Sequence, residues 1–506
     1  MSRRTIVTLA LSALCLTACG GSGSENGGAT SAGPAKDELT VLQSFSFTNM
    51  NPLIDPARPS TRISGMAIET AAKYVFEGGQ AVLKPWLCTG WEQIEPNRWR
   101  FQVRPDVTFS NGEPLNAEAF KFSLETTLAA ERSGGAVVFR GAAIEVVDEL
   151  TFDVVTAEPN GIVPQQMSYF FVLPPAYYAS AGEEKFGEAP IGTGPYTITA
   201  VDPGVSVALA RSDTYWGEAP QVAKITVRVV QDASTRVAEL ERGTADIVEA
   251  VPPLLRDRVS ALSGAEIRET PTNVRMMLVF NSHLGNTEDV KVRRAVSAAI
   301  NREAIAEGIF KESAAALNGI FVPGEIGHVA STPIHNPELA RQLVAELGGS
   351  LAVDLYATAG ALPMDEQIIQ AVQAQLAEVG IEATITTGTA QAILRPFYAG
   401  QNAGAVLTQL GLFYPDSSLI FGNYFTSYAA AGAPSSNDEM ERLADEAFKS
   451  GDDAVRQAKY EEAQRIAIDE ALWSPIVALT DSWGVAKDLK WTPRPDQQYD
   501  LATASW

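Results

Sequence analysis

The side chains that could carry out chemistry are few in type and widely spaced. His283, His328 and His335 form no His-Glu-x-x-His pair, so a zinc hydrolase site has little support. The sequence contains no Gly-x-Ser-x-Gly elbow and no Gly-x-x-x-x-Gly-Lys phosphate loop, and residues 192–194 (GTG) lack the third glycine of a dinucleotide-binding loop. The sequence therefore predicts no bound cofactor and no metal site.

The carboxylates are numerous and give the chain a strongly acidic balance. Asp and Glu number 61 against 38 Lys and Arg, a formal net charge of −23, which disfavours nucleic acid as a partner. Two of these carboxylates could serve as the acid and base of a glycosidase, although no pair has a sequence feature that would raise a pKa. A secreted hydrolase therefore stays an alternative, which turnover of a captured compound would reveal.

The N-terminal residues, which include two of the three cysteines, predict export. Arg3 and Arg4, an apolar run over residues 6–16 and a small-residue exit at residues 16–19 (LTAC) form a signal peptide at residues 1–18. This run of eleven residues falls short of the roughly 20 that a membrane span requires. Cys15 belongs to this segment and Cys88 lies beside apolar Leu87, so a disulfide framework is excluded and Cys88 is interpreted as a packing residue.

Residues 19–36 are rich in Gly, Ser and Ala and are expected to form a flexible tether. Residues 16–19 resemble the lipobox of bacterial lipoproteins, which implies that Cys19 becomes a lipidated N-terminus on the outer face of the plasma membrane. An ordinary secretory signal with a chance cysteine is the alternative. Ser2-Arg3-Arg4 also leaves the general secretory and twin-arginine routes open.

The remaining chain has the composition of a folded α/β protein. Its 506 residues suggest about three domains, and 46% hydrophobic with 20% charged residues is typical of globular proteins. Trp99, Phe101 and Val103 alternate with polar residues and predict a strand, and Asn116 then caps a helix. Alternation at residues 351–355 and 381–385 on either side of a helical stripe predicts a parallel βαβ unit.

Several ordered segments resemble the extracytoplasmic solute-binding proteins of ABC importers, specifically the peptide, opine and nickel family. The longest stretch, residues 99–118, resembles the family's strand, turn and helix start. Shorter matches are residues 190–196 (PIGTGPY), 215–217 (YWG), 243–246 (GTAD), 280–281 (FN), 292–295 (VRRA) and 377–381 (AEVGI). Most of these motifs are interpreted as scaffold, in turns and ion pairs that do not touch ligand.

The resemblance implies an α/β fold of the periplasmic-binding-protein type, two-lobed (type II) around a ligand cleft and with an extra inserted domain. By analogy, lobe I comprises residues 37–75, 190–272 and 475–506, the inserted domain II residues 76–189, and lobe III residues 273–474. Lobe closure would capture a solute, most plausibly a peptide or a peptide-like or opine compound, for a membrane permease with separate ATPases. The protein is expected to be a monomer and not an enzyme.

The resemblance also implies ligand contacts after the first strand and before the pair Pro415-Asp416. The candidate contacts from these and two weaker positions are Phe45, Ser46, Phe47, Phe139, Arg140, Phe413, Tyr414, Asp416 and Tyr424. Phe45 and Phe47 could instead be core residues, and Arg140 a surface arginine.

The chain departs from the dipeptide-binding members at two anchor positions. It lacks their aspartate ahead of Pro415-Asp416 and their arginine ahead of the helix at Ile369. These departures disfavour a short peptide and favour longer peptides held through their backbone, an opine or a sugar derivative. Nickel would require a chelator, because no histidine cluster exists to coordinate it.

Overall fold

The computed structural model describes residues 36–506 except 79, 131–132, 330–333, 361, 363, 413 and 423–433. Residues 37–506 form one compact unit. Among the described residues, eleven strands form one large sheet in the order β15-β14-β16-β12-β17-β11-β1-β10-β9-β8, with β13 paired to β17. Their bounds are β1 Glu38–Gln43, β8 Tyr196–Asp202, β9 Ser206–Arg211, β10 Lys224–Val229, β11 Ile247–Val248, β12 Ala265–Phe280, β13 Ala314–Ala316, β14 Leu351–Thr358, β15 Ile381–Gly388, β16 Ala405–Leu410 and β17 Trp473–Ala486.

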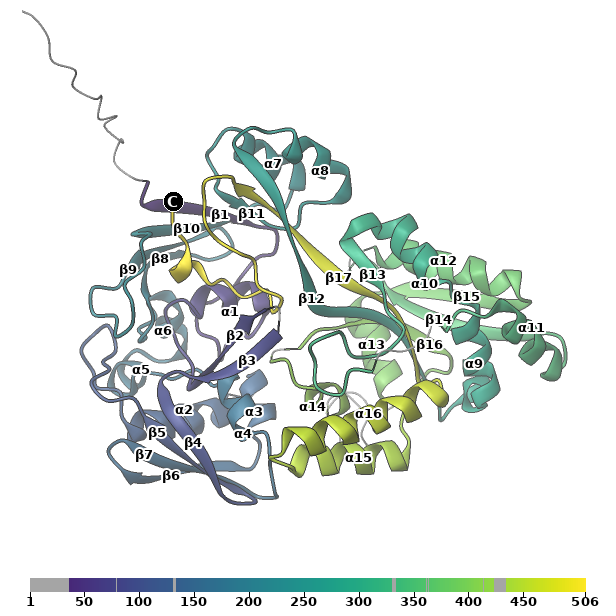
Figure 1. Ribbon diagram of the computed structural model, residues 1–506, viewed down its shortest axis with the longest axis horizontal. Coiled ribbons are helices and arrows are strands. Elements are labelled where there is room, and N and C mark those ends of the chain that lie inside the picture. Colours follow the sequence, from purple (N-terminus) through teal and green to yellow (C-terminus); the bar gives the residue numbers. More distant parts are fainter. Residues whose placement is uncertain are drawn as a thin grey trace, which may run out of the picture. The chain divides into compact units, whose positions relative to one another are not determined.

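Two long antiparallel strands, β12 and β17, join the two halves of this sheet (Figure 1). The C-terminal end of β17 pairs with β11, and the C-terminal half of β12 pairs with β16. The β12–β17 ladder shifts register between Pro271 and Arg275, so the pair is irregular near its middle. Such irregularities bend a strand and increase its twist.

The half that contains β14, β15 and β16 is covered by helices. β14 and β15 run parallel on either side of α12, so the predicted βαβ unit is confirmed. Asn301 caps α10, as its side chain accepts a hydrogen bond from the amide of Ala304 at 2.9 Å. The helices of this region are α9 Val290–Ala299, α10 Arg302–Ile305, α11 Pro337–Glu346, α12 Asp365–Glu378, α13 Ala390–Tyr398, α14 Ser418–Ile420, α15 Asp438–Lys449 and α16 Asp453–Asp469.

Residues 72–188 carry two further sheets. A hairpin of β2 and β3 precedes a four-stranded antiparallel sheet in the order β4-β5-β7-β6. The predicted strand is β5, and Asn116 caps α2 by accepting from the amide of Ala119 at 3.0 Å. The elements are β2 Ala72–Glu77, β3 Gln80–Pro85, β4 Cys88–Glu95, β5 Arg98–Val103, β6 Ala142–Asp148, β7 Thr151–Thr156, α2 Ala117–Ala129, α3 Gly134–Val138, α4 Val163–Gln166, α5 Pro175–Ala181 and α6 Glu183–Glu188.

An aromatic stack fills the space between the four-stranded sheet and α2. Phe152 lies between Phe101 and Phe120, with ring centroids 5.4 and 4.7 Å away. Cys88 is fully buried in the same core and its thiol is free, which agrees with a packing role. Burial raises the pKa of this thiol well above its ordinary value, so Cys88 is not an activated nucleophile.

Three more helices border the half of the sheet that contains β1, namely α1 Arg58–Ser64, α7 Ala233–Glu241 and α8 Pro253–Ser260. The glycines of the 192–194 segment allow a close approach to the chain after α1. A Cβ at Gly192 would lie 2.0 Å from the carbonyl oxygen of Ala67, and one at Gly194 would lie 2.5 Å from that of Met66. Among the described residues, no helix combines the length and the apolar composition needed to cross a membrane.

Candidate functional site

A cavity of about 670 Å³ is the candidate binding site. Four remote stretches supply most of its lining: residues 61–75 around α1 and β2, residues 168–171, residues 215–221 and residues 494–504. Pro415 adds a contact from the segment after β16. The volume lies in the range of small-molecule pockets, which commonly combine aromatic walls with a few polar groups.

A buried carboxylate, Glu69, organises one wall of this cavity. It accepts hydrogen bonds from the indole N–H groups of Trp86 at 2.7 Å and Trp216 at 2.8 Å, and from the hydroxyls of Thr193 at 2.9 Å and Tyr215 at 3.2 Å. Burial raises the pKa of Glu69, and these donors oppose the increase. The two indoles are thereby fixed edge to face, with ring centroids 5.4 Å apart.

Two cations lie over the tryptophans of this wall. The Arg104 guanidinium lies 4.4 Å from the Trp216 ring centroid, and its Nε donates to the carbonyl of Trp86 at 2.9 Å. Lys73 lies 4.6 Å from the Trp86 ring and 3.6 Å from the Asp500 carboxylate. The wall therefore offers flat aromatic surfaces next to positive charge.

A buried ion pair also borders the cavity, because Arg62 is among its lining residues. Arg62 contacts Glu249 at 2.5 Å and lies 4.7 Å from the Tyr499 ring centroid. Burial lowers the pKa of Arg62, but Glu249 together with Tyr499 and Asp481 outweighs burial, so the net pKa is raised. Glu249 also accepts from the Ser44 hydroxyl at 2.7 Å, so the end of β1 and the C-terminal segment are tied to one charge pair.

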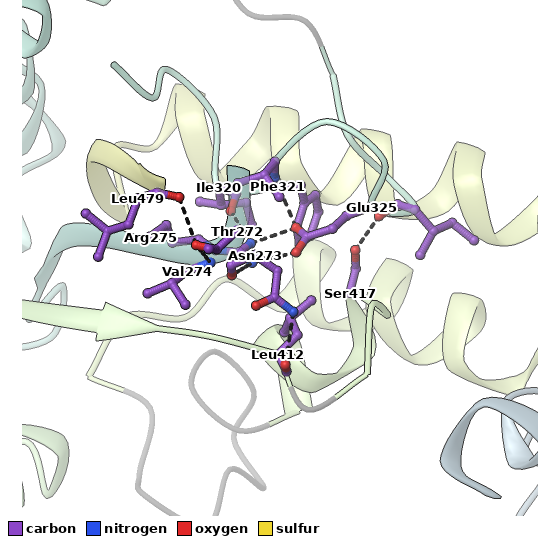
Figure 2. Close-up of polar contacts among 12 residues, drawn as sticks. Thr272, Asn273, Val274, Arg275, Ile320, Phe321, Glu325, Leu412, Ser417 and Leu479 are labelled. Carbon is purple, nitrogen blue, oxygen red and sulfur yellow. Dashed lines mark hydrogen bonds and ion pairs between the residues drawn. The ribbon is translucent and has the colours of Figure 1, made fainter. Parts of the chain in front are cut away.

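Contacts near the middle of the β12–β17 pair connect the two halves of the sheet. The carbonyl oxygen of Leu412, which follows β16, accepts a hydrogen bond from the side-chain amide of Asn273 at 3.0 Å (Figure 2). The same oxygen accepts from Arg58 at 3.2 Å. Gln497 donates to Asp481 on β17 at 2.6 Å, and burial raises the pKa of this carboxyl. A solute between α1 and the segment after β16 would therefore meet polar groups from both halves.

A second buried ion pair braces β12 where its register shifts. Arg275 contacts Glu325 through two hydrogen bonds of 2.6 and 2.7 Å, and also donates to the carbonyls of Ile320 and Asn273 at 2.7 Å each (Figure 2). Burial raises the pKa of Glu325 while Arg275 and the amide of Val322 oppose the rise. This brace holds the 320–325 segment against β12.

The residues predicted after the first strand do not enter this cavity. β1 ends at Gln43, so Phe45 and Phe47 lie in the segment that follows this strand. The Phe45 side chain is 64% exposed and Ser46 is exposed, whereas Phe47 is 1% exposed in the apolar core, which matches the alternative that the sequence left open for Phe47. None of the three is among the residues that line the cavity.

The two weaker candidates at residues 139–140 separate in the same way. Phe139 is buried and packs edge to face on Phe170 at 5.3 Å, while Arg140 is exposed. Neither lines the cavity, and Phe139 belongs to the apolar core beside the four-stranded sheet. Their contact with a ligand stays a prediction.

The residues around Pro415 lie beside the cavity but point into the core. Tyr414 and Asp416 are each 2% exposed. Asp416 forms an ion pair with Arg456, which also contacts Asp453 at 2.8 Å. This pairing gives Asp416 a structural partner, and its predicted ligand contact stays untested. Phe413, Tyr424 and Cys19 lie outside the described residues.

The wall built on Glu69 was missed by sequence reasoning. Thr193, Tyr215 and Trp216 belong to motifs that were interpreted as scaffold, but Trp216 lines the cavity. Arg104 lies at the end of the alternating strand and was noted only for its polarity. Sequence reasoning had no signal for Glu69, because this residue lies in no motif. It is 17 residues from Trp86 and 147 residues from Trp216 along the chain. Within the described ranges, no group of three His, Cys, Asp or Glu could hold a metal ion.

Comparisons with known proteins agree with this architecture. The family model for bacterial extracellular solute-binding proteins, family 5 Middle, matches residues 82–432. The nickel-binding periplasmic protein of Escherichia coli is 23% identical over 480 residues, with 87% of this chain and 89% of that protein covered. The glutathione-binding protein GsiB of the same species (O1:K1 / APEC) is 25% identical over 471 residues, with 88% and 89% covered.

Solved structures share the fold. HbpA2 from Haemophilus parasuis matches with a TM-score of 0.83 and 18% identity, covering 92% of this chain and 99% of that one. NikA from Brucella suis in complex with Fe(III)-EDTA matches with a TM-score of 0.80 and 22% identity over 92% and 99%. With the family-model match, these results establish that the chain belongs to the family 5 bacterial extracellular solute-binding proteins and has their two-lobed α/β fold.

Proposed function

We propose that this substrate-binding protein of an ABC importer captures a peptide, or a peptide-like or opine compound, in the cavity walled by Trp86 and Trp216. The observation that carries the proposal is the Glu69-centred wall, which places Arg104 and Lys73 over fixed indoles. A solute with carboxylate and amino groups would find cations there and the acidic Glu218 and Asp500 in the same lining.

The curated relatives support this solute class. They include a probable D,D-dipeptide-binding protein, a glutathione-binding protein and a nickel-binding protein. All are binding proteins, so the hydrolase alternative is not supported. A metal would enter this site as a chelate, because the described residues offer no cluster to coordinate a bare ion.

The proposed division into lobes cuts the large sheet between its two halves. Lobe I, residues 37–75, 190–272 and 475–506, holds β1, β8 to β11, the N-terminal half of β12 and all but the first two residues of β17. Lobe III, residues 273–474, holds β14 to β16 and their helices, and the inserted domain II, residues 76–189, holds the four-stranded sheet. Closure of lobe III on the other two would present the loaded protein to permease subunits with separate ATPases. The protein would act as a monomer, tethered through a lipid on Cys19.

The test is to identify and retitrate the natural solute. Native mass spectrometry of the purified protein would detect a co-purifying compound, which is then extracted and titrated against wild type, Arg104→Gln and Arg341→Gln. Loss of the cavity cation is expected to weaken binding roughly tenfold, about 1.4 kcal/mol. The control Arg341→Gln, at an exposed position on α11 outside the cavity lining, is expected to bind as wild type. Equal weakening in both variants would contradict the site, and a chemically altered compound would contradict a binding function.

A further inference from the structure

The segment that follows β7 touches the loop between α15 and α16 through its backbone. The amide of Gly161 donates a hydrogen bond of 2.9 Å to the carbonyl oxygen of Phe448, the penultimate residue of α15. In the proposed division, Gly161 belongs to domain II and Phe448 to lobe III. This bond therefore crosses between two bodies that move apart when the protein opens.

Glycines make this contact on both sides. A Cβ at Gly161 would lie 1.9 Å from the carbonyl oxygen of Ser450 and 2.5 Å from the amide of Gly451, and backbone atoms cannot swing aside. In the reverse direction, a Cβ at Gly451 would lie 2.7 Å from Oε1 of Gln93. Neither glycine has a positive φ, so the lack of space for a side chain, and not the backbone conformation, explains why both positions hold glycine.

The domain II side of the contact is held rigidly. Asn160 donates from its side chain to Gln166 at 2.9 Å and accepts from the amide of Ile162 at 3.0 Å. Its carbonyl accepts from the Trp99 indole at 2.8 Å. Gly161 is thus presented on a fixed turn, and an added methyl group could not be absorbed by a small backbone shift.

Apolar contacts surround the glycine pair. Val138 and Tyr169 of domain II, together with Tyr74 of β2, pack against the lobe III core that contains Met440 and Tyr414. Burial raises the pKa of Tyr169 to about 12, so its hydroxyl stays neutral in this contact. The contact therefore combines these apolar side chains with the hydrogen bond from Gly161 to Phe448. The groups on both sides belong to the protein.

We propose that this glycine contact is a latch that holds lobe III against domain II, so that the solute meets a protein already partly closed. The inference rests on the proposed capture by lobe closure. Because the apparent Kd equals the intrinsic Kd divided by the fraction of competent protein, the latch sets affinity without touching solute. The glycine contact itself lies outside the cavity lining, although Tyr74 and Tyr169 from the neighbouring apolar contacts belong to that lining.

The test measures the distance between the two bodies in solute-free protein. Nitroxide labels are placed at Val147→Cys in β6 and Gln370→Cys in α12, both exposed, in a Cys15→Ser, Cys19→Ser background where Cys88 stays buried. Gly161→Ala is expected to raise the ratio of open to closed molecules tenfold or more, as roughly 1.4 kcal/mol of lost contact would do. Gly90→Ala is the matched control, since a Cβ there meets nothing within 4 Å.

Equal distance distributions in Gly161→Ala and Gly90→Ala would overturn the latch. If circular dichroism shows that Gly161→Ala does not fold, Gly451→Ala decides the question, because its methyl group meets the movable end of Gln93. A smaller shift toward open molecules supports the latch, and no shift overturns it. Since no solute is present, failure here leaves the capture function standing, and failure to find a solute leaves the latch standing.

Discussion

At the scale of single residues, the polar face of β5 shows how charges are committed to structure. Asp153 on β7 lies directly opposite Arg100 and accepts from its Nε at 2.8 Å and from Arg98 at 3.0 Å. The hydrogen bond from Arg100 is the main cause that lowers the pKa of Asp153. The carboxylate is 2% exposed, so it has little access to water in place of these donors.

Asp153→Asn is expected to lower the free energy of unfolding by about 1 to 2 kcal/mol at pH 7, because three charge-assisted bonds weaken while both arginines stay partly solvated. Since the folded pKa is depressed, the stabilisation is present above the unfolded value near 3.9 and is lost as pH falls through the folded pKa. Urea unfolding from pH 7 to pH 2.5 checks this. A difference in the free energy of unfolding between wild type and variant that persists at the lowest pH would contradict this expectation.

Residue-level prediction succeeded where local pattern was enough. Asn116 was predictable as a cap because a cap acts on the next three residues. The ligand contact of Phe45, which the family resemblance implies, stays a prediction, and Phe45 is exposed outside the cavity lining. Glu69 could not be predicted, since its four donors come from segments that only the tertiary fold brings together.

At the scale of elements, the brace between β12 and the 320–325 segment is a buried pair with little access to water. Glu325→Gln is expected to cost about 3 to 5 kcal/mol of unfolding free energy, because Arg275 stays buried without a counter-charge. The double variant Arg275→Met/Glu325→Met should recover part of this loss, since no lone charge is then buried. Chemical denaturation of wild type, Arg275→Met, Glu325→Met and the double variant gives the coupling energy.

Additive losses in this cycle would contradict direct coupling between Arg275 and Glu325. Full recovery is not expected, because Arg275 also donates to the carbonyls of Ile320 and Asn273, which the double variant leaves unpaired. A control pair on the surface, Lys291 and Glu346 at 2.9 Å, should change the free energy of unfolding by less than about 1 kcal/mol.

The elements themselves were largely predictable. The alternation at residues 98–104 and the βαβ unit at residues 351–385 are strong local signals, and both are confirmed. The length of β12 and its partnership with β17 were not predictable, because residues 265–280 pair with a strand some 200 positions later. Strand β11 covers only two residues, Ile247 and Val248, which pair with β1 and β17.

At the scale of the whole molecule, solute capture should raise thermal stability by an amount that grows with the logarithm of the affinity. A compound that binds only the folded protein adds RT ln(1 + [L]/Kd), about 2.7 kcal/mol at one hundred times Kd. The extracted solute should therefore raise the melting temperature of wild type and of Arg341→Gln alike, and raise that of Arg104→Gln less at equal concentration. Identical shifts in all three proteins would contradict the cavity.

The attachment of the molecule to the cell is a separate question, because capture and anchoring depend on different parts of the chain. If Cys19 carries the lipid, Cys19→Ala removes the only anchor that we propose, and the protein is expected to leave the membrane fraction. Cys15→Ala is the matched control, since Cys15 lies within the signal peptide and would be cleaved away. Membrane and soluble fractions are compared by immunoblot for both variants. Retention of Cys19→Ala in the membrane fraction would contradict lipidation at this residue, whereas its release with unchanged solute affinity would show that the tether serves location alone.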